Sequence, residues 1–379
     1  MTVRFSSRLS GLASSPIRQI LSLIERPGMI SFAGGLPAPE SFPQLSLTAL
    51  PASYLQYGST EGETSLRNRV AHNLNASGLE CSPEQVLILS GSQQGIDLVA
   101  KLFIDQGTSV AVEDPTYLAA LQVFRYYGAR LLPYRVAKPQ EALSGEPPAF
   151  IYIIPTFQNP TAHCYDAAAR SVLAAACDER QVPLFEDDPY RDLAYEPCER
   201  KPICAHLRQT SWIYQGSFSK SLAPGLRLGY LAASADLVPI LIRLKQAADL
   251  HSNRISQWLV LEQLQSPEYP QRLATLVASY RRKRDFFADV LEREMRDLAT
   301  WQLPPGGLFF WLQLARAIDT RELLPRAIEK KVAFMPGEFF FADAVPARGA
   351  LRLNFSHATE AQIEQGLPEL AATLRQALN

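Results

Sequence analysis

Short apolar segments recur through residues 86–232 of this chain, and most of them are separated by segments with the length and pattern of helices. The apolar segments occupy residues 86–90, 109–113, 130–134, 150–154, 183–186, 211–215 and 228–232. Apolar strands that alternate with helices predict a mainly parallel sheet with both faces covered. The sequence therefore predicts an α/β fold, with a large domain built on a seven-stranded sheet.

The chain is long enough for a second domain. Its 379 residues exceed the size at which a single core stops growing. A long, charge-rich segment at residues 269–295 predicts a helix that bridges two domains. We assign an N-terminal arm and part of the small domain, a large domain, and a small C-terminal α+β domain to residues 1–44, 45–270 and 271–379.

The N-terminal arm carries two local signals. A serine pair followed by Pro16 predicts the start of a helix over residues 16–24. Residues 31–43 are rich in Gly and Pro, which predicts a loop without regular structure. Such a loop is either a linker or part of the wall of a site.

Polar residues follow the predicted strands one after another. In a mainly parallel sheet, ligands bind beyond the carboxyl ends of the strands. We therefore expect the polar side chains at these ends to converge: Ser92, Tyr117, Asn159, Asp187, Tyr190 and Lys220. This convergence is a stronger signal than any one of the short motifs taken alone.

The stretch from Tyr214 to Gly229 suggests what these side chains bind. Lys220 lies in a run of serine and glycine residues, and Arg227 follows seven positions later. Small residues let a backbone approach an anion closely, and an arginine can bind two phosphate oxygens. A desolvated lysine beside a phosphate can attack a carbonyl, and pyridoxal phosphate carries both a phosphate and an aldehyde. The alternative is a surface loop with a solvated lysine.

The composition argues against several other classes of protein. The net charge is −1, which gives no sign of binding to nucleic acid, and no apolar run is long enough to span a bilayer. The five cysteines form no Cys-x-x-Cys pair and the histidines are scattered, so we expect no metal site. Reduced thiols and the lack of an apolar signal segment predict a cytoplasmic protein.

Five motifs occur in order at suitable distances: Ala-Gly-Gly-Leu-Pro, Gly-Ser-Gln-Gln, Asn-Pro-Thr, Glu-Asp-Asp-Pro-Tyr and Gly-Ser-Phe-Ser-Lys, beginning at residues 33, 91, 159, 186 and 216. With them, nearly the whole chain resembles the class I and II aminotransferases of fold type I. Within that family it is most similar to the 2-aminoadipate and kynurenine aminotransferase branch, which is related to the aminotransferase-like domains of MocR regulators. The resemblance implies pyridoxal 5′-phosphate as the cofactor.

The resemblance also implies roles for individual residues. Lys220 matches the lysine that forms the internal aldimine with the cofactor and moves the proton at the substrate α-carbon. Asp187, three residues before Tyr190, matches the carboxylate paired with the pyridine nitrogen; its neighbour Asp188 is the residue most easily confused with it. The remaining cofactor contacts are matched by Asn159 and Tyr190 at the phenolic oxygen, Tyr117 on the ring face, and Ser92, Gln93, Ser217 and Arg227 at the phosphate.

Substrate binding and assembly are implied in the same way. Arg352 matches the arginine that binds the substrate α-carboxylate, and Arg18, Gly35 and Leu36 match residues near the substrate side chain. Tyr57 matches a tyrosine that reaches the phosphate of the neighbouring subunit, which implies a homodimer with shared active sites.

One position departs from the family pattern. The family usually has Gly after Asn-Pro-Thr, where this chain has Ala162. If that position requires a positive φ, alanine would cost on the order of 1 kcal/mol. We expect a slightly altered backbone that leaves Asn159 in place.

These observations predict an aminotransferase that moves an amino group from an L-amino acid to a 2-oxo acid, with 2-oxoglutarate as the expected acceptor, in a ping-pong reaction. One alternative is a lyase, cyclase or decarboxylase on the same scaffold, because a fold does not decide which bond breaks. Another is a cofactor-binding sensor domain without catalysis. Such a regulator needs a basic DNA-binding module, for which residues 1–31 are too short.

Overall fold

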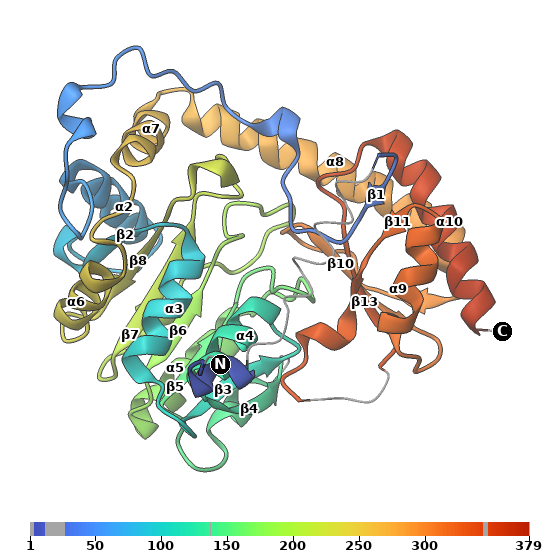
Figure 1. The fold of residues 1–379 in the computed structure, drawn as a ribbon, viewed down its shortest axis with the longest axis horizontal. Helices are drawn as coiled ribbons and strands as arrows, with labels where there is room; N and C mark the ends of the chain where they lie inside the picture. Colours follow the sequence, from blue (N-terminus) through green and yellow to red (C-terminus); the bar gives the residue numbers. More distant parts are fainter. Residues whose placement is uncertain (1–3, 12–26, 137, 344–347, 379) are drawn as a thin grey trace.

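The structure is a computed structural model that describes residues 4–11, 27–136, 138–343 and 348–378. The helix predicted over residues 16–24 lies outside these ranges, and so does Arg18. Two larger sheets organise the described part of the chain, one of seven strands and one of four (Figure 1).

The seven-stranded sheet confirms the predicted fold class. Its strands are β2 (Val86–Leu89), β3 (Ser109–Asp114), β4 (Arg130–Arg135), β5 (Phe150–Ile153), β6 (Leu184–Asp187), β7 (Trp212–Ser217) and β8 (Gly229–Ala233). They lie in the order β2-β8-β7-β6-β5-β3-β4, and only β8 runs antiparallel to its neighbours. The carboxyl ends of the other strands therefore share one edge with the amino end of β8.

Helices cover both faces of this sheet, as the apolar strands predict. They are α2 (Thr64–Ala76), α3 (Ser92–Phe103), α4 (Leu118–Tyr127), α5 (Ala167–Arg180), α6 (Val238–Asp249) and α7 (Arg254–Gln265). In β2, Leu87 and Leu89 pack in the core with α3, α4 and α6, whereas Val86 and Ile88 pack with α2, α5 and α7. Side chains of a strand alternate between its faces, so one apolar strand serves two cores.

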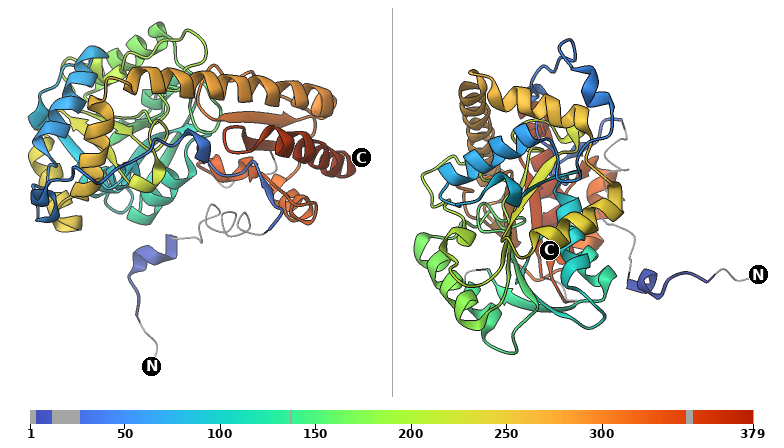
Figure 2. Two further views of the ribbon diagram at one scale, coloured as in Figure 1. Left: turned by 90° about the horizontal axis from the view of Figure 1, so that it is seen from above. Right: turned by 90° about the vertical axis from the view of Figure 1, so that its left-hand side faces the viewer.

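The four-stranded sheet belongs to the second unit. Its order is β12 (Met335–Pro336), β13 (Ala350–Asn354), β10 (Phe309–Leu314) and β9 (Ala299–Thr300), all antiparallel. The helices of this unit are α8 (Tyr269–Met295), α9 (Thr320–Glu329) and α10 (Glu360–Leu378). Helix α8 runs from beside α7 to α10 and so reaches both units (Figures 1 and 2). The domain boundaries given above stay a prediction.

The N-terminal segment corrects one expectation. β1 (Ile30–Ser31) pairs in parallel with β11 (Val332–Ala333), so the prediction that residues 31–43 contain no regular structure is wrong at its first residue. It is also wrong at the single 3₁₀ turn η2 (Pro39–Ser41). The other 3₁₀ turns are Ser7–Gly11, Ala52–Leu55, Pro83–Gln85, Pro139–Leu143, Ile203–His206, Pro224–Leu226 and Gly337–Phe340. Among the helices of the described ranges, none has both the length and the apolar character that crossing a membrane requires.

Candidate active site

A cavity of about 360 Å³ lies where the strand ends of the large sheet meet the second unit. Twelve of the fourteen site residues named from the sequence line it: Gly35, Leu36, Ser92, Gln93, Tyr117, Asn159, Asp187, Tyr190, Ser217, Lys220, Arg227 and Arg352. The expected convergence of strand ends therefore occurs. Sequence reasoning missed Phe309 and Met335, which come from the strands of the second unit.

Asp187 is a buried carboxylate at the end of β6, with 3% of its surface exposed. Its two oxygens accept hydrogen bonds from Gln215 at 2.9 Å and from the Tyr152 hydroxyl at 2.8 Å. Both donors are neutral, and burial raises the pKa of Asp187 to about 6. A buried carboxylate of this kind gains stability from a cationic partner, because a positive charge favours its ionised form.

Lys220 follows β7 and donates a 2.8 Å hydrogen bond from Nζ to the carbonyl of Gly35. Within the described ranges, no carboxylate forms an ion pair with it. Burial, together with the positive charges of Arg352 and Arg227, lowers the pKa of Lys220 to about 8. At pH 7 about a tenth of this amine is therefore uncharged, far more than for a solvated lysine, and the uncharged amine is the form that acts as a nucleophile.

Arg352 lies in the middle of β13 and is 4% exposed. Its guanidinium lies 4.0 Å from the centre of the Phe309 ring and 4.9 Å from that of Phe340. It donates to Asn159 Oδ1 at 2.7 Å and to the carbonyl of Ala33 at 2.6 Å, and its Nε has no partner among the described residues. A desolvated guanidinium with neutral neighbours is suited to bind a carboxylate in two-point contact.

The start of α3 and Arg227, two residues before β8, form a basic cradle at the edge of the cavity. Gly91 has φ +84°, and a Cβ at this position would lie 2.4 Å from a guanidinium nitrogen of Arg227. A Cβ at Gly229 would lie 3.0 Å from the backbone nitrogen of Ser92. The two glycines therefore let Arg227 and the first N–H groups of α3 approach the same point, an arrangement that favours a phosphate.

The loop after β5 holds Asn159 in the cavity. Its amide nitrogen lies 3.5 Å from the Tyr190 hydroxyl, so the two polar groups meet at one place. Ala162, three residues later, has φ 59°. The alanine therefore adopts the left-handed conformation, and its N–H donates to the carbonyl of Gln158 at 2.6 Å. Asn159 lines the cavity with alanine at this position.

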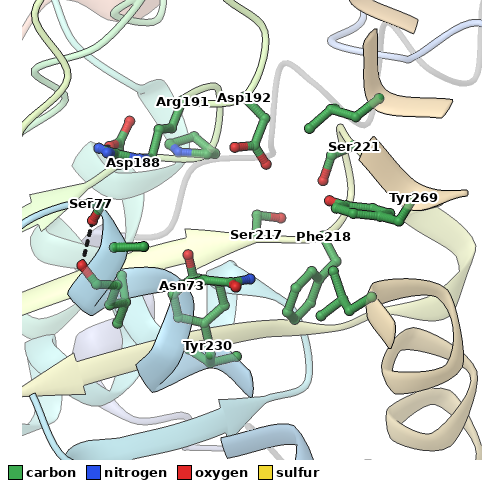
Figure 3. A pocket seen from close by; sticks show the side chains of 16 residues that line it. Asn73, Ser77, Asp188, Arg191, Asp192, Ser217, Phe218, Ser221, Tyr230 and Tyr269 are labelled. Carbon is green, nitrogen blue, oxygen red and sulfur yellow. Dashed lines mark hydrogen bonds and ion pairs between the residues drawn. The ribbon is translucent and has the colours of Figure 1, made fainter. Parts of the chain in front are cut away.

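Asp188 faces away from this cavity. It accepts a 3.0 Å hydrogen bond from Tyr214, pairs with Arg191 at 3.4 Å, and lines a second cavity of about 280 Å³. Figure 3 shows this second cavity, in which Asp188 lies beside Arg191, and Ser217, Phe218 and Ser221 line other parts of the wall. The choice of Asp187 over Asp188 therefore selects the carboxylate that shares a cavity with Lys220.

Tyr57 does not reach the cavity of its own chain. It is 76% exposed, and its ring meets His251 edge-on at 5.8 Å. Arg254 fixes the loop by donating to the carbonyls of Ser53 and Gln56 at 2.5 and 2.9 Å.

Comparison with known proteins decides the family. The model of the family "Aminotransferase class I and II" matches residues 38–370. The chain belongs to this family. It is 36% identical to "Aromatic-amino-acid aminotransferase 1" of Thermococcus litoralis, an alignment that covers 99% of this chain and 94% of the relative. It is therefore a pyridoxal-phosphate-dependent aminotransferase, which confirms the family, the cofactor and the class of reaction that the motifs predict.

A solved structure and a regulator extend the comparison. The α-aminoadipate aminotransferase LysN of Thermus thermophilus, complexed with N-(5′-phosphopyridoxyl)-L-leucine, superposes with a TM-score of 0.90 and 35% identity over 99% of this chain and 98% of that one. An uncharacterized HTH-type transcriptional regulator of Bacillus subtilis, YisV, is 29% identical over 86% of this chain and 68% of the regulator. About a third of that regulator therefore has no counterpart in the alignment.

Proposed function

We propose that the cavity around Lys220 is the active site of this aminotransferase. The observation that carries the proposal is its pattern of charge. Asp187, Lys220 and Arg352 line one cavity, and each has neutral hydrogen-bond partners among the described residues. Burying unpaired charges costs several kcal/mol each, so such a set is retained where a ligand supplies the opposite charges.

Pyridoxal phosphate fits this set. Its pyridine nitrogen, when protonated, would pair with Asp187, and its phosphate would lie in the cradle of Ser92, Gln93, Ser217 and Arg227. Tyr117 would stack on the ring, and Asn159 and Tyr190 would donate hydrogen bonds to the phenolic oxygen. When bound, the cofactor supplies an aldehyde for the amino group and an electron-poor ring that stabilises negative charge at the substrate α-carbon.

The chain's own residues then bind the substrate and move its proton. Arg352 binds the α-carboxylate and so fixes which bond at the α-carbon is aligned for cleavage. Lys220, with its lowered pKa, acts first as a nucleophile and then as the general base that takes the α-proton. The donor is an L-amino acid and the acceptor 2-oxoglutarate. Gly35, Leu36 and Arg18 are the residues we assign to the neighbourhood of the substrate side chain.

We further propose that the active form is a homodimer in which Tyr57 reaches the partner's cofactor phosphate. Support comes from the exposure of Tyr57 and from the apolar surface of the segment that precedes it. Five large apolar side chains on this segment are at least 38% exposed: Phe42, Leu45, Leu47, Leu55 and Tyr57 itself. A series of exposed apolar residues along one segment is typical of a surface that another chain covers.

One experiment tests the reaction. The purified protein, loaded with pyridoxal phosphate, is mixed with one aromatic, one aliphatic and one acidic L-amino acid, with and without 2-oxoglutarate, and the products are identified by mass spectrometry. Transamination gives the 2-oxo acid of the donor together with pyridoxamine phosphate, and glutamate appears only when 2-oxoglutarate is present. Carbon dioxide, an elimination product or a cyclised product as the main outcome would overturn the proposal, as would no reaction with any donor.

A further inference from the structure

Two cysteines outside the catalytic cavity lie together on the loops that carry Asn159 and Tyr190. Cys164 follows Asn159 by five residues, and Cys198 follows Tyr190 by eight. Both thiols are free, partly exposed and packed against the same apolar cluster. As a thiol, Cys164 donates to the carbonyl of Glu199 at 3.4 Å, which places its sulfur beside the backbone next to Cys198.

A buried arginine joins the same two loops. Arg170 is wholly buried on α5, and its guanidinium donates to the carbonyls of Pro155 at 2.8 Å and Glu199 at 3.1 Å. The nitrogen that makes both bonds lies 3.9 Å from Cys164 Sγ. The nearest carboxylate, Glu186, lies 4.0 Å away on the other terminal nitrogen, and the other groups on the nitrogen beside Cys164 are neutral oxygens.

These surroundings differ from those of the other cysteines. A hydrogen bond from Cys198 and the charge of Arg170 outweigh burial and lower the pKa of Cys164 to about 7. Burial raises the pKa of Cys81 to about 11 and that of Cys177 to about 12. The thiolate is the reactive form of cysteine, and oxidation-sensitive cysteines combine thiolate character with exposure and a second thiol nearby.

We propose that Cys164 and Cys198 form a peroxide-sensitive thiol pair that reversibly joins the Asn159 loop to the Tyr190 loop by a disulfide. In the first step, the Cys164 thiolate takes an oxygen from hydrogen peroxide, the O–O bond breaks, and with one proton the products are a sulfenic acid and water. In the second step, the Cys198 thiol attacks the sulfenic sulfur, the S–O bond breaks, and a second water leaves with the Cys198 proton. Each disulfide thus consumes one peroxide.

The first step of this reaction makes the attacking thiol of the second step easier to ionise. The neighbouring Cys164 thiolate is the main cause that raises the pKa of Cys198. That negative charge disappears when Cys164 becomes a sulfenic acid, so Cys198 becomes easier to ionise at the moment when its attack is required. The proposal concerns thiol chemistry and does not depend on the role assigned to the catalytic cavity.

The test uses the full chain with pyridoxal phosphate bound, treated with a small excess of hydrogen peroxide at pH 7. We expect the thiol count of the denatured protein to fall from five to three, and tryptic peptides containing Cys164 and Cys198 to be recovered as one linked species until dithiothreitol is added. Cys164 should react on the order of a hundredfold faster than Cys81, because the gain in thiolate fraction outweighs the loss of intrinsic nucleophilicity.

Two variants and a control sharpen the result. Cys198→Ser should stop the reaction at the sulfenic acid, which dimedone traps on Cys164, and Cys164→Ser should remove both the fast reaction and the cross-link. Cys81→Ala is the matched control and should cross-link like the natural chain. Equal oxidation of all five thiols, or loss of the Cys164 thiol without a link to Cys198, would overturn the proposal, and both outcomes are measured on the unaltered protein.

Discussion

The guanidinium of Arg352 donates a 2.7 Å hydrogen bond to the amide oxygen of Asn159, although 193 residues separate the two in the chain. The bond joins β13 of the second unit to the loop after β5. With its oxygen engaged, Asn159 turns its amide nitrogen toward the Tyr190 hydroxyl, 3.5 Å away. Arg352 therefore orients Asn159, which we assign as a contact of the cofactor. The Nε of Arg352 has no partner among the described residues.

This relationship leads to a prediction for Arg352→Lys. The variant keeps the positive charge but loses the planar fork that binds a carboxylate at two points. We expect kcat/KM for L-amino acids to fall by about a hundredfold to a thousandfold, equivalent to the loss of one buried, charged contact. The measurement is steady-state kinetics with a good donor, with thermal unfolding to show that the variant is folded.

A substrate control separates binding of the carboxylate from structural damage. A primary amine that lacks the α-carboxylate has nothing for Arg352 to bind. In the variant, the factor by which kcat/KM falls should therefore be at least ten times smaller for this amine than for the amino acid. A similar loss for both substrates would mean that Arg352 acts only by holding Asn159 in place.

Asp187→Asn should stabilise the cofactor-free protein while it destroys activity. The folded pKa of Asp187, about 6, lies above its ordinary value of 3.8, so the folded state holds the extra proton between these pH values. Ionised Asp187 therefore lowers the free energy of unfolding increasingly as the pH rises from about 4 to 6. Above about pH 6 this destabilisation is constant, at roughly 1–3 kcal/mol. Gln215 can turn its amide to accept from the new amide, because its Oε1 has no partner in the described ranges.

Two measurements check this prediction. Melting temperatures of the cofactor-free natural and variant proteins should nearly coincide at pH 4 and diverge by pH 7, with the variant more stable. The activity of the variant loaded with pyridoxal phosphate should fall on the order of a hundredfold to a thousandfold, because no anion remains to keep the ring nitrogen protonated. If the difference in melting temperature between the two proteins is the same at pH 4 and pH 7, Asp187 is not the uncompensated charge that we describe.

Much of this site follows from the sequence because parallel strands bring their ends together. The residues after β2, β3, β5, β6 and β7 meet at one edge of the sheet whatever their spacing in the chain. Once the strand ends were located in the sequence, most residues that line the cavity were therefore identified. Helix α8 was predicted with its observed limits, because Pro270 suits its first turn and its charged pattern is long. The family motifs then added the residues that periodicity does not reveal.

Other features carry no local signal. Arg227 enters the site from the amino end of β8, the one antiparallel strand of the seven-stranded sheet. An apolar segment does not indicate the direction in which its strand runs. Residues 238–265 form two helices, because α6 ends before Leu250, which has φ 62° without any Gly or Pro nearby, and α7 begins after Asn253 as its cap. Strands of two residues, such as β1 and β12, are too short to show a period of two. Helix α10 was not predicted at all.

Ala162→Gly should stabilise the protein. Alanine at φ 59° bears a steric cost of about 1–2 kcal/mol, whereas glycine adopts this conformation freely but loses more entropy on folding. The balance predicts a gain of about 0.5–1 kcal/mol in the free energy of unfolding, with activity unchanged because Asn159 already lies in place. Denaturant unfolding measures the gain. Ala175→Gly, on the exposed side of α5, is the matched control and should lose a similar amount.

Mixed dimers test whether Tyr57 serves the partner's site. Lys220→Ala removes the nucleophile, and Tyr57→Ala removes the proposed phosphate contact, so each variant alone should be inactive or weakly active. If Tyr57 acts across the interface, a hybrid of the two variants has one site with both defects and one site with none. Random exchange of equal amounts makes half of the dimers hybrid, so activity should recover to about a quarter of the natural value.

If Tyr57 serves the site of its own subunit, the expected activity of the mixture is different. If Tyr57 acted within its own subunit, each site of a hybrid would contain one defect, and mixing would give only the average of the two variants. The chains are exchanged by mild denaturation and refolding with pyridoxal phosphate, and the natural protein taken through the same steps sets the scale. Recovery above the average therefore requires both a dimer and a shared site, which the exposed position of Tyr57 in a single chain leads us to expect.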